Sequence, residues 1–394
     1  MPVFHFHLQV ITPVHIGTER TKDYISGLDF MYDRNKGEYQ VYSFNKLLPN
    51  LEQRQLNAIT GYLLDRPDKV SGYISSQRLI TETILRYSWP SAYGTAREIR
   101  RHIQDGLGNW IIPGSSLKGS IRSILATYLY RHSGKKGKIN LEDLFGKIEN
   151  NLMRFIQVSD SKMTCSKGSV PSKGSVPSKG SVPVGIYPIK IFSGDLPDKG
   201  MWKDLRNGGH KAQFSSEHFV SFYEMLNDDY RRIPPAEGRT TIRWGWDGDL
   251  FNARIKNQVK NVDLIFNHED PKWLIQRIQE HTNNFLKKEM AYFRAFPNKY
   301  LQEDFFDELK WLIEENEKDE KSCLLRVGGN VGWHSITGDW QYDDYVAARE
   351  QPNSYRNQLK TRKILFDLTL DENNEERIRF TLPGFVKLTL EKVE

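Results

Sequence analysis

One stretch, Trp110 to Arg122, constrains the fold of this chain more than any other, and it reads WIIPGSSLKGSIR. Its short apolar run is stopped by Pro113-Gly114, because proline fixes φ and glycine accepts a positive φ. Ser115 or Ser116 is then placed to cap a helix. Apolar side chains recur beyond the caps at a spacing of 3.6 residues, at Leu117, Ile121, Ile124, Leu125, Tyr128 and Leu129. The stretch therefore predicts a strand, a tight turn and a helix.

The predicted helix carries two cations on its first turns. Lys118 and Arg122 are four residues apart and share a face of the helix, and Gly119 has no side chain to block a close approach. Free N–H groups at a helix start, together with these cations, favour a phosphate. A mononucleotide phosphate loop would end in Gly-Lys-Ser/Thr, which is absent here. The pattern therefore favours the phosphate backbone of a polyanion.

The segment Ile112–Arg122 resembles the signature of the RAMP superfamily, the guide-RNA-binding proteins of CRISPR systems. Three other segments fit the same superfamily. Val10–Gly17 resembles its first strand and loop, Gly328–His334 its glycine-rich loop, and Pro383–Leu390 its last strand. The resemblance thus covers nearly the whole chain. The order of the segments and the length are most similar to the type III-A (Csm) subunit that caps the 3′ end of the guide RNA.

Patterns along the rest of the chain mix strands and helices with antiparallel signals, which indicates the α+β class. Strands are expected over 4–10, 28–32, 38–44, 155–158, 185–192, 218–223, 377–380 and 385–390. Helices are expected over 46–64, 74–87, 273–293 and 300–318. The resemblance implies a ferredoxin-like, RNA-recognition-type antiparallel sheet core with helical insertions.

We expect three parts along the chain. Residues 1–163 form an N-terminal ferredoxin-like core with the signature helix. Residues 164–184 form a repeat loop. Residues 185–394 form a C-terminal α+β half with a helical insertion at 270–320, the glycine-rich loop and the closing strands.

The repeat loop holds three copies of the hexad Ser-Lys-Gly-Ser-Val-Pro, which cannot bury a core, so a mobile segment is expected. One interpretation is that its regularly spaced lysines contact a phosphate chain, namely Lys167, Lys173 and Lys179. A slippage expansion tolerated in an exposed loop is the favoured interpretation. Deletion of two hexads is then expected to leave RNA affinity unchanged.

The net charge of +6 is distributed unevenly. Residues 95–138 hold nine Lys/Arg and two Asp/Glu, a local net of 9 − 2 = +7, and include the signature helix. Residues 302–320 hold two Lys and nine Asp/Glu, a local net of 2 − 9 = −7. The basic block favours an anionic partner, and the acidic block is interpreted as a solvated helix face.

Cysteine usage limits the chemistry. Cys165 and Cys323 are the only cysteines, which excludes a disulfide framework and a four-cysteine zinc site and suits a reducing cytoplasm. The sequence shows no transmembrane run and no signal peptide, so no membrane partner is expected.

Candidate RNA-binding residues come from four places. The signature contributes Ser115, Ser116, Lys118, Gly119 and Arg122, and the opening loop contributes His15. Cations interleave with aromatics between Arg239 and Lys260, as in a groove that tracks a single strand; this run contributes Arg243 and Arg254. Ordinary amphipathic packing of Trp244, Trp246 and their neighbours is the slightly favoured alternative there. The resemblance adds Gly329, Gly332 and Trp333, for which a plain turn is the alternative.

No catalytic residue, metal or cofactor is expected, because no nucleophile elbow, His-Glu-x-x-His helix or kinase set is present. The resemblance raises one question, since related backbone subunits carry an aspartate after the first strand for metal-dependent target cleavage. Asp23 and Asp29 lie there, but the surrounding sequence matches poorly, so both are interpreted as structural.

The predicted function is a non-catalytic guide-RNA (crRNA)-binding structural subunit of a type III-A CRISPR effector complex in antiviral defence. It would bind the 3′ region of the guide and end the subunit filament. The expected partners are crRNA, other RAMP subunits of the Csm complex and target RNA. The alternative is a metal-dependent endoribonuclease that processes guides or cuts targets, for which His15, Asp23 and His132 are the only suggestive groups.

Overall fold

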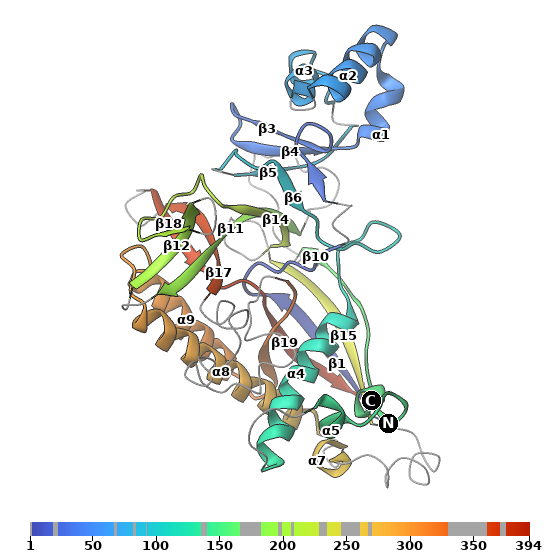
Figure 1. The fold of residues 1–394 in the computed structure, drawn as a ribbon. Coiled ribbons are helices and arrows are strands. Elements are labelled where there is room, and N and C mark those ends of the chain that lie inside the picture. The colour runs from blue at the N-terminus through green and yellow to red at the C-terminus, as the bar shows by residue number, and fades with distance from the viewer. Residues whose placement is uncertain are drawn as a thin grey trace.

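Figure 1 shows the chain as a computed structural model. The structure describes residues 2–18, 23–66, 69–81, 84–91, 93–134, 140–165, 183–195, 199–205, 209–227, 235–245, 261–266, 270–329, 361–370 and 376–394.

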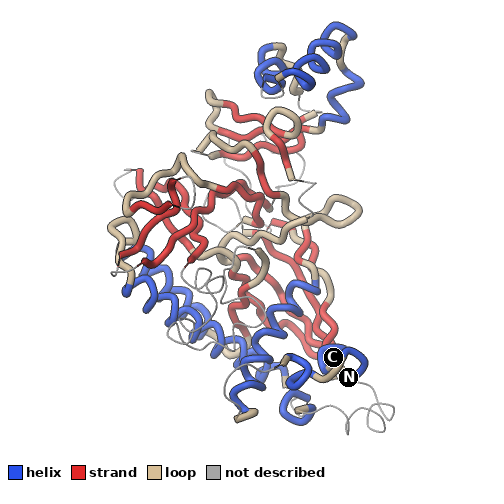
Figure 2. Tube along the Cα trace, viewed as in Figure 1, coloured by secondary structure: helices blue, strands red, loops and turns tan. Residues whose placement is uncertain are grey.

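Strands and helices are interspersed along these residues, and Figure 2 shows both types throughout the molecule. The strands are β1 (Val3–Val10), β2 (Tyr24–Ile25), β3 (Phe30–Asp33), β4 (Glu38–Tyr42), β5 (Leu85–Pro90), β6 (Glu98–Arg100), β7 (Ile111–Ile112), β8 (Ile156–Val158), β9 (Ser161–Lys162), β10 (Thr164–Cys165), β11 (Val184–Asp195), β12 (Lys199–Leu205), β13 (Gly209–Lys211), β14 (Ser221–Leu226), β15 (Ala236–Trp244), β16 (Ser322–Arg326), β17 (Thr361–Leu370), β18 (Glu376–Thr381) and β19 (Phe385–Val393). The helices are α1 (Phe44–Leu47), α2 (Gln53–Asp65), α3 (Val70–Ser76), α4 (Gly114–His132), α5 (Leu141–Phe145), α7 (Val262–Phe266), α8 (Pro271–Ala295) and α9 (Glu303–Glu317), with short 3₁₀ turns at Leu48–Asn50, Ile148–Asn150 and Leu152–Phe155. The predicted α+β class is confirmed.

The first sheet is built around β1. Its strand order is β10-β15-β1-β19-β16, with β8 also paired to β15, and every one of these pairs is antiparallel. Side chains of β1 alternate as predicted, since Phe4, Phe6, Leu8 and Val10 are buried while the residues between them are half-buried. The N-terminal strand therefore lies between two strands from the C-terminal half of the chain.

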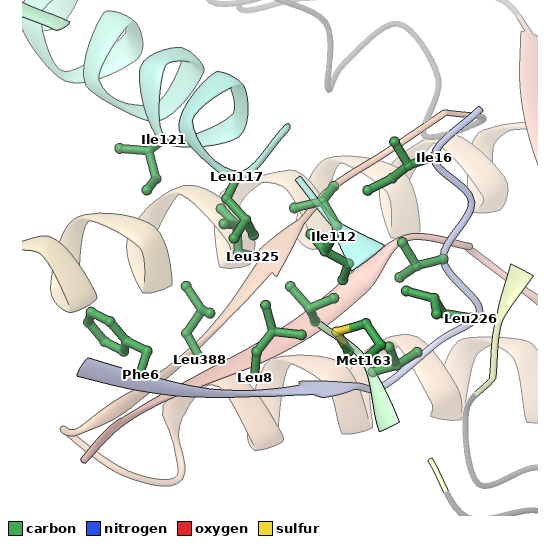
Figure 3. Packing of buried hydrophobic residues seen from close by; sticks show 14 of the residues in the cluster. Phe6, Leu8, Ile16, Ile112, Leu117, Ile121, Met163, Leu226, Leu325 and Leu388 are labelled. Atoms are coloured by element: carbon green, nitrogen blue, oxygen red, sulfur yellow. The ribbon is translucent and has the colours of Figure 1, made fainter. Parts of the chain in front are cut away.

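The face of this sheet that carries the buried residues of β1 packs against α4. Figure 3 shows Leu117 and Ile121 of α4 in one hydrophobic cluster with Phe6, Leu8 and Leu388 of the sheet. Burial of such side chains is worth about 1.5–3 kcal/mol each. This packing fixes which face of α4 is left for a ligand.

Helices α8 and α9 close the edge of the sheet at β16 with side-chain hydrogen bonds. Asn316 of α9 accepts from Leu324 N at 2.7 Å, and Thr282 of α8 donates to Leu324 O at 2.6 Å. Gln279 donates to Ser322 O at 2.8 Å. An exposed strand edge invites pairing with another chain, and these amide and hydroxyl groups satisfy it internally.

The second sheet has the order β13-β12-β11-β14-β6-β2, and β17 joins β11 to β18. Its pairs are antiparallel except for β14 with β6.

None of the described helices is long and apolar enough to cross a membrane.

A small lobe projects from the second sheet at the top of Figure 1. Strands β3, β4 and β5 form its three-stranded sheet, and α1 to α3 pack on it around a separate small core. The helix predicted over 74–87 is wrong: α3 ends at Ser76, and Leu85–Pro90 is strand β5, paired with β4. Tyr87 and Trp89 are buried with a half-buried residue between them, which is the period of a strand rather than of a helix.

Candidate nucleic-acid interface

The signature stretch folds as a strand, a turn and a helix, as predicted, but the cap differs. Helix α4 begins at Gly114 with Pro113 in the N-cap position, so neither Ser115 nor Ser116 caps it. Instead Asp160 accepts the Gly114 N–H through Oδ1 at 2.7 Å. Because a carboxylate already occupies the first free N–H of the helix, a phosphate would meet this protein further along α4.

Lys118 and Arg122 lie on the first turns of α4, both half-buried. Within the described part of the chain neither forms an ion pair, and Arg122 Nε is buried without a hydrogen-bond partner. The Arg122 guanidinium lies 5.4 Å from the ring centroid of Phe145 in α5, which holds it in place. Burial, and then the positive charge of Arg122, lower the pKa of Lys118. Two adjacent cations without a carboxylate partner among the described residues can bind an anion.

The two glycines of the signature have different roles. A Cβ at Gly114 would lie 2.0 Å from Val158 O, so that position admits only glycine. A Cβ at Gly119 would meet nothing within 4 Å, although a glycine inside a helix is destabilising. The fold therefore explains Gly114 and leaves Gly119 without a structural reason. Ser115 is exposed and Ser116 half-buried on the same turns.

His15 sits in the loop after β1 and is almost fully buried. Its Nδ1 lies 2.9 Å from Glu224 O of β14, and its ring packs edge-on against Tyr223 at 5.0 Å between ring centroids. Burial lowers the pKa of His15 to about 4; positive Arg100 and Lys363 act in the same direction, while Glu224 O and the negative charge of Asp23 oppose it. The imidazole is neutral at physiological pH.

His102 connects the opening loop to the signature. Its Nδ1 accepts from Ile16 N at 3.1 Å, and its Nε2 donates to Ile111 O at 3.0 Å, just before α4. Burial, and then the nearby His15, lower the pKa of His102 to about 3. Its own backbone N–H donates to Glu224 Oε2 at 2.9 Å, and Tyr87 also bonds that carboxyl group. Burial raises the pKa of Glu224 to about 8.

The other two segments that resemble the superfamily meet the opening loop as well. Gly329 N donates to His15 O at 2.7 Å, and Gly384 N donates to Pro13 O at 3.0 Å. Gly328 has φ of +88°, and a Cβ there would lie 2.3 Å from His15 O. Figure 3 shows Ile16 in one cluster with residues of α4 and of β16. The opening loop, the signature, the first glycines of the glycine-rich loop and the closing strand thus converge on one region.

The predicted groove of cations and aromatics is not joined to this region by the described residues. Arg243 is exposed on β15, on the face of the sheet opposite α4, because Ile242 and Trp244 on either side of it are buried. Trp244 is buried against Phe266, which agrees with the slightly favoured interpretation of ordinary packing and not with a stacking role. The cations of this run beyond residue 245, Arg254 among them, lie outside the described residues. So do Gly332, Trp333 and the repeat over 166–182.

The carboxylates and histidine weighed for catalysis have structural partners. Asp23 accepts from Arg101 N at 3.1 Å and pairs with Arg100 at 3.4 Å. Asp29 accepts from Ile25 N at 2.9 Å. His132 is exposed at the end of α4, with Nδ1 2.8 Å from Tyr128 O. In the described ranges no three His, Cys, Asp or Glu residues gather where they could hold a metal ion.

The sequence did not predict the roles of His102 and Glu224. Both are buried, and their hydrogen bonds hold the opening loop to the start of α4 and to β14. The only signal for Glu224 is a carboxylate amid the apolar residues of the strand sequence SFYEML. Its partners, at positions 87 and 102, are over a hundred residues away in sequence.

Known proteins resemble this chain in sequence and in fold. The chain is similar to the CRISPR system Cms protein Csm5 of Streptococcus thermophilus, at 25% identity over an alignment of 189 residues; the match covers 40% of this chain and 51% of that protein. The match thus spans about half the length of that curated relative.

Two solved structures share the fold over nearly the whole chain. One is a chain of a Csm–crRNA–target RNA ternary complex from a type III-A CRISPR-Cas system (TM-score 0.60, 18% identity, covering 98% of this chain and 100% of that one). The other is the Csm5 of T. onnurineus (TM-score 0.58, 16% identity, covering 96% and 99%). The RAMP superfamily matches residues 7–333, and the chain belongs to that superfamily.

Proposed function

We propose that this protein is a crRNA-binding structural subunit of a type III-A CRISPR effector complex, that it binds the 3′ region of the guide and ends the subunit filament, and that it does not cut RNA. The observation that carries this proposal is the pair Lys118 and Arg122, held half-buried on the signature helix with no carboxylate partner among the described residues. The named relatives support the complex and the RNA, since one solved relative is a chain of a Csm–crRNA–target RNA assembly.

The chemistry of the site suits a guide whose sequence varies. Lysine and arginine contacts to phosphate carry no sequence information, so they accept any spacer. Gly119 lies between these half-buried cations on α4, and a Cβ there would meet nothing within 4 Å, so the backbone can be approached closely. Contacts that recur in stacked subunits would add avidity to a modest affinity of the single chain.

Three further parts belong to the same proposal. The sheet around β1, with α4 and α8 on one face, is proposed to be the ferredoxin-like core. The division at 1–163, 164–184 and 185–394 is proposed only as an order of segments along the chain, because the core sheet itself takes β15, β16 and β19 from 185–394. Target RNA and the other RAMP subunits of a Csm complex are proposed as partners besides crRNA.

A gel-shift assay tests the proposal. The purified chain is mixed with 3′-labelled guide RNA with and without Mg²⁺, and the wild type is compared with Lys118→Ala/Arg122→Ala. We expect an intact, salt-sensitive shifted band that the double variant weakens. Lys46→Ala/Arg54→Ala removes the same charge from exposed positions on the distant lobe and serves as the matched control.

Mg²⁺-dependent shortening of the RNA would contradict the non-catalytic role and favour the endoribonuclease, with Asp23 and Asp29 the first residues to mutate. A shift that both double variants weaken equally would mean that α4 is not the binding site.

A further inference from the structure

We propose that His15 recognises a ribose 2′-hydroxyl of the bound strand, with its Nε2 as hydrogen-bond acceptor, so that the opening loop distinguishes RNA from DNA. This inference rests on the proposed RNA-binding function and adds the chemical group that one residue reads.

The first step is the tautomer of the ring. Nδ1 lies 2.9 Å from the carbonyl oxygen Glu224 O, which can only accept, so Nδ1 carries the proton and donates. The neutral ring then has a bare lone pair on Nε2. Burial keeps the ring neutral, since the pKa of His15 falls to about 4. His15 therefore offers an acceptor at physiological pH and has no proton to give a phosphate.

The second step is the orientation of the free edge. Tyr223 and His102 pack edge-on against the ring, at 5.0 and 6.1 Å between centroids, and fix its plane. Glycines flank the Cδ2–Nε2 edge: a Cβ at Gly17 would lie 3.2 Å from Nε2, and a Cβ at Gly329 would lie 3.5 Å from Cδ2. Nε2 has no hydrogen-bond partner among the residues that the structure describes. A side chain on either glycine would crowd this edge, so the two glycines let a ligand atom approach Nε2 at the edge of an otherwise buried ring.

The third step is the identity of the donor. On a nucleic-acid backbone the phosphate only accepts, and the 2′-hydroxyl is the group that donates. A base N–H could also donate, but it would impose a sequence preference on a subunit whose cations read only phosphate. Ile16, next in the chain, donates its N–H to His102 Nδ1 at 3.1 Å, and His102 Nε2 bonds Ile111 O at 3.0 Å just before α4. The loop is thus tied to the start of the helix that carries Lys118 and Arg122, and we infer that a strand bound there reaches His15. The 2′-hydroxyl is therefore the donor that fits.

The experiment is a filter-binding scan with the full-length chain. Each guide carries one 2′-deoxy or one 2′-fluoro nucleotide in its 3′ region; the fluoro sugar keeps an RNA-like conformation but lacks the donor. For the wild type we expect one position at which both changes weaken binding about two- to tenfold, the range for one neutral hydrogen bond.

Two substitutions of His15 distinguish the role of Nδ1 from that of Nε2. His15→Asn places an amide N–H where Nδ1 was, keeps a donor for Glu224 O and removes the Nε2 acceptor. His15→Gln places an amide oxygen near the position of Nε2. We expect the penalty at that position to vanish in His15→Asn and to persist in His15→Gln, and to be equal at pH 6 and pH 8. Gly17→Ala, which crowds Nε2 while leaving His15 in place, is expected to abolish it too.

The outcomes are distinct. A scan with no position whose penalty depends on residue 15 overturns the inference, even if the all-ribose guide binds through Lys118 and Arg122. A penalty that grows on acidification toward pH 6 also overturns it, because that would indicate an imidazolium donating to phosphate. No binding of the all-ribose guide by the wild type overturns the proposed function and the inference with it.

Discussion

Gly119→Ala separates a structural role of the signature helix from an RNA-binding role, because the two predict opposite effects. The position is six residues into α4, and the added Cβ would meet no atom within 4 Å. Alanine in place of glycine inside a helix stabilises by about 0.5–1 kcal/mol. The substitution should therefore slow hydrogen exchange of the α4 amides about two- to fivefold, the factor that this free energy gives.

The same methyl group should weaken RNA binding. If the guide backbone rests against Gly119 while its phosphate bonds Lys118 or Arg122, a Cβ lifts the strand off the helix. Loss of one charge-assisted hydrogen bond costs about 1.5–3 kcal/mol, which corresponds to a roughly tenfold to hundredfold loss of affinity. Filter binding of a 3′-labelled guide at fixed salt measures this loss on the protein used for hydrogen exchange.

Two other glycines supply controls. Gly61→Ala lies inside α2, where a Cβ also meets nothing within 4 Å, so it should stabilise its helix equally and leave RNA affinity unchanged. Gly114→Ala should disrupt the start of α4, because its Cβ would lie 2.0 Å from Val158 O. An affinity for Gly119→Ala within about twofold of the wild type, with α4 stabilised, would show that the guide backbone does not rest against Gly119.

Three further predictions follow from the contacts. Glu224→Gln should remove a pH dependence of stability. Burial raises the pKa of Glu224 from 4.5 to about 8, so its contribution to stability is full below pH 4.5 and is lost as the pH rises toward 8. Denaturant unfolding at pH 5 and pH 8 measures this loss, and a variant whose stability changes with pH as much as that of the wild type would contradict it. Asn316→Ala should cost about 1–3 kcal/mol, because it leaves Leu324 N without its acceptor at the edge of β16; a loss below about 0.5 kcal/mol in urea unfolding would show that water replaces the side chain. Lys118→Ala should lower the slope of log affinity against log salt by about 1, and a parallel line at lower affinity would argue against a phosphate contact.

Local patterns predicted the elements that later carry the site. The alternation of Phe4, Phe6 and Leu8 predicted β1, and the 3.6-residue spacing after Pro113 predicted α4. Both patterns arise because apolar side chains face one core at the period of the element, so they can be recognised from the sequence alone. The helix predicted over 74–87 failed because Tyr87 and Trp89 alternate in a strand whose partner, β4, lies over forty residues earlier.

The pairing of distant polar groups could not be predicted. Nothing near Gly114 in sequence shows that Asp160 takes its N–H, so the expected serine caps were wrong. The bridge from Ile16 through His102 to Ile111 joins three segments by single hydrogen bonds, and such bonds leave no periodicity. The residue types of the site were predictable; the tautomer of His15 and the opposite-face position of Arg243 required the fold.

Photo-crosslinking shows which end of the guide lies against α4. Guides with one 4-thiouridine near the 3′ or the 5′ end are bound by the full-length chain within its effector complex, irradiated, and the crosslinked peptides are identified. We expect crosslinks from the 3′ position to the peptide around Lys118 and Arg122, and fewer of them in Lys118→Ala/Arg122→Ala. Crosslinks to that peptide from the 5′ position alone would contradict it.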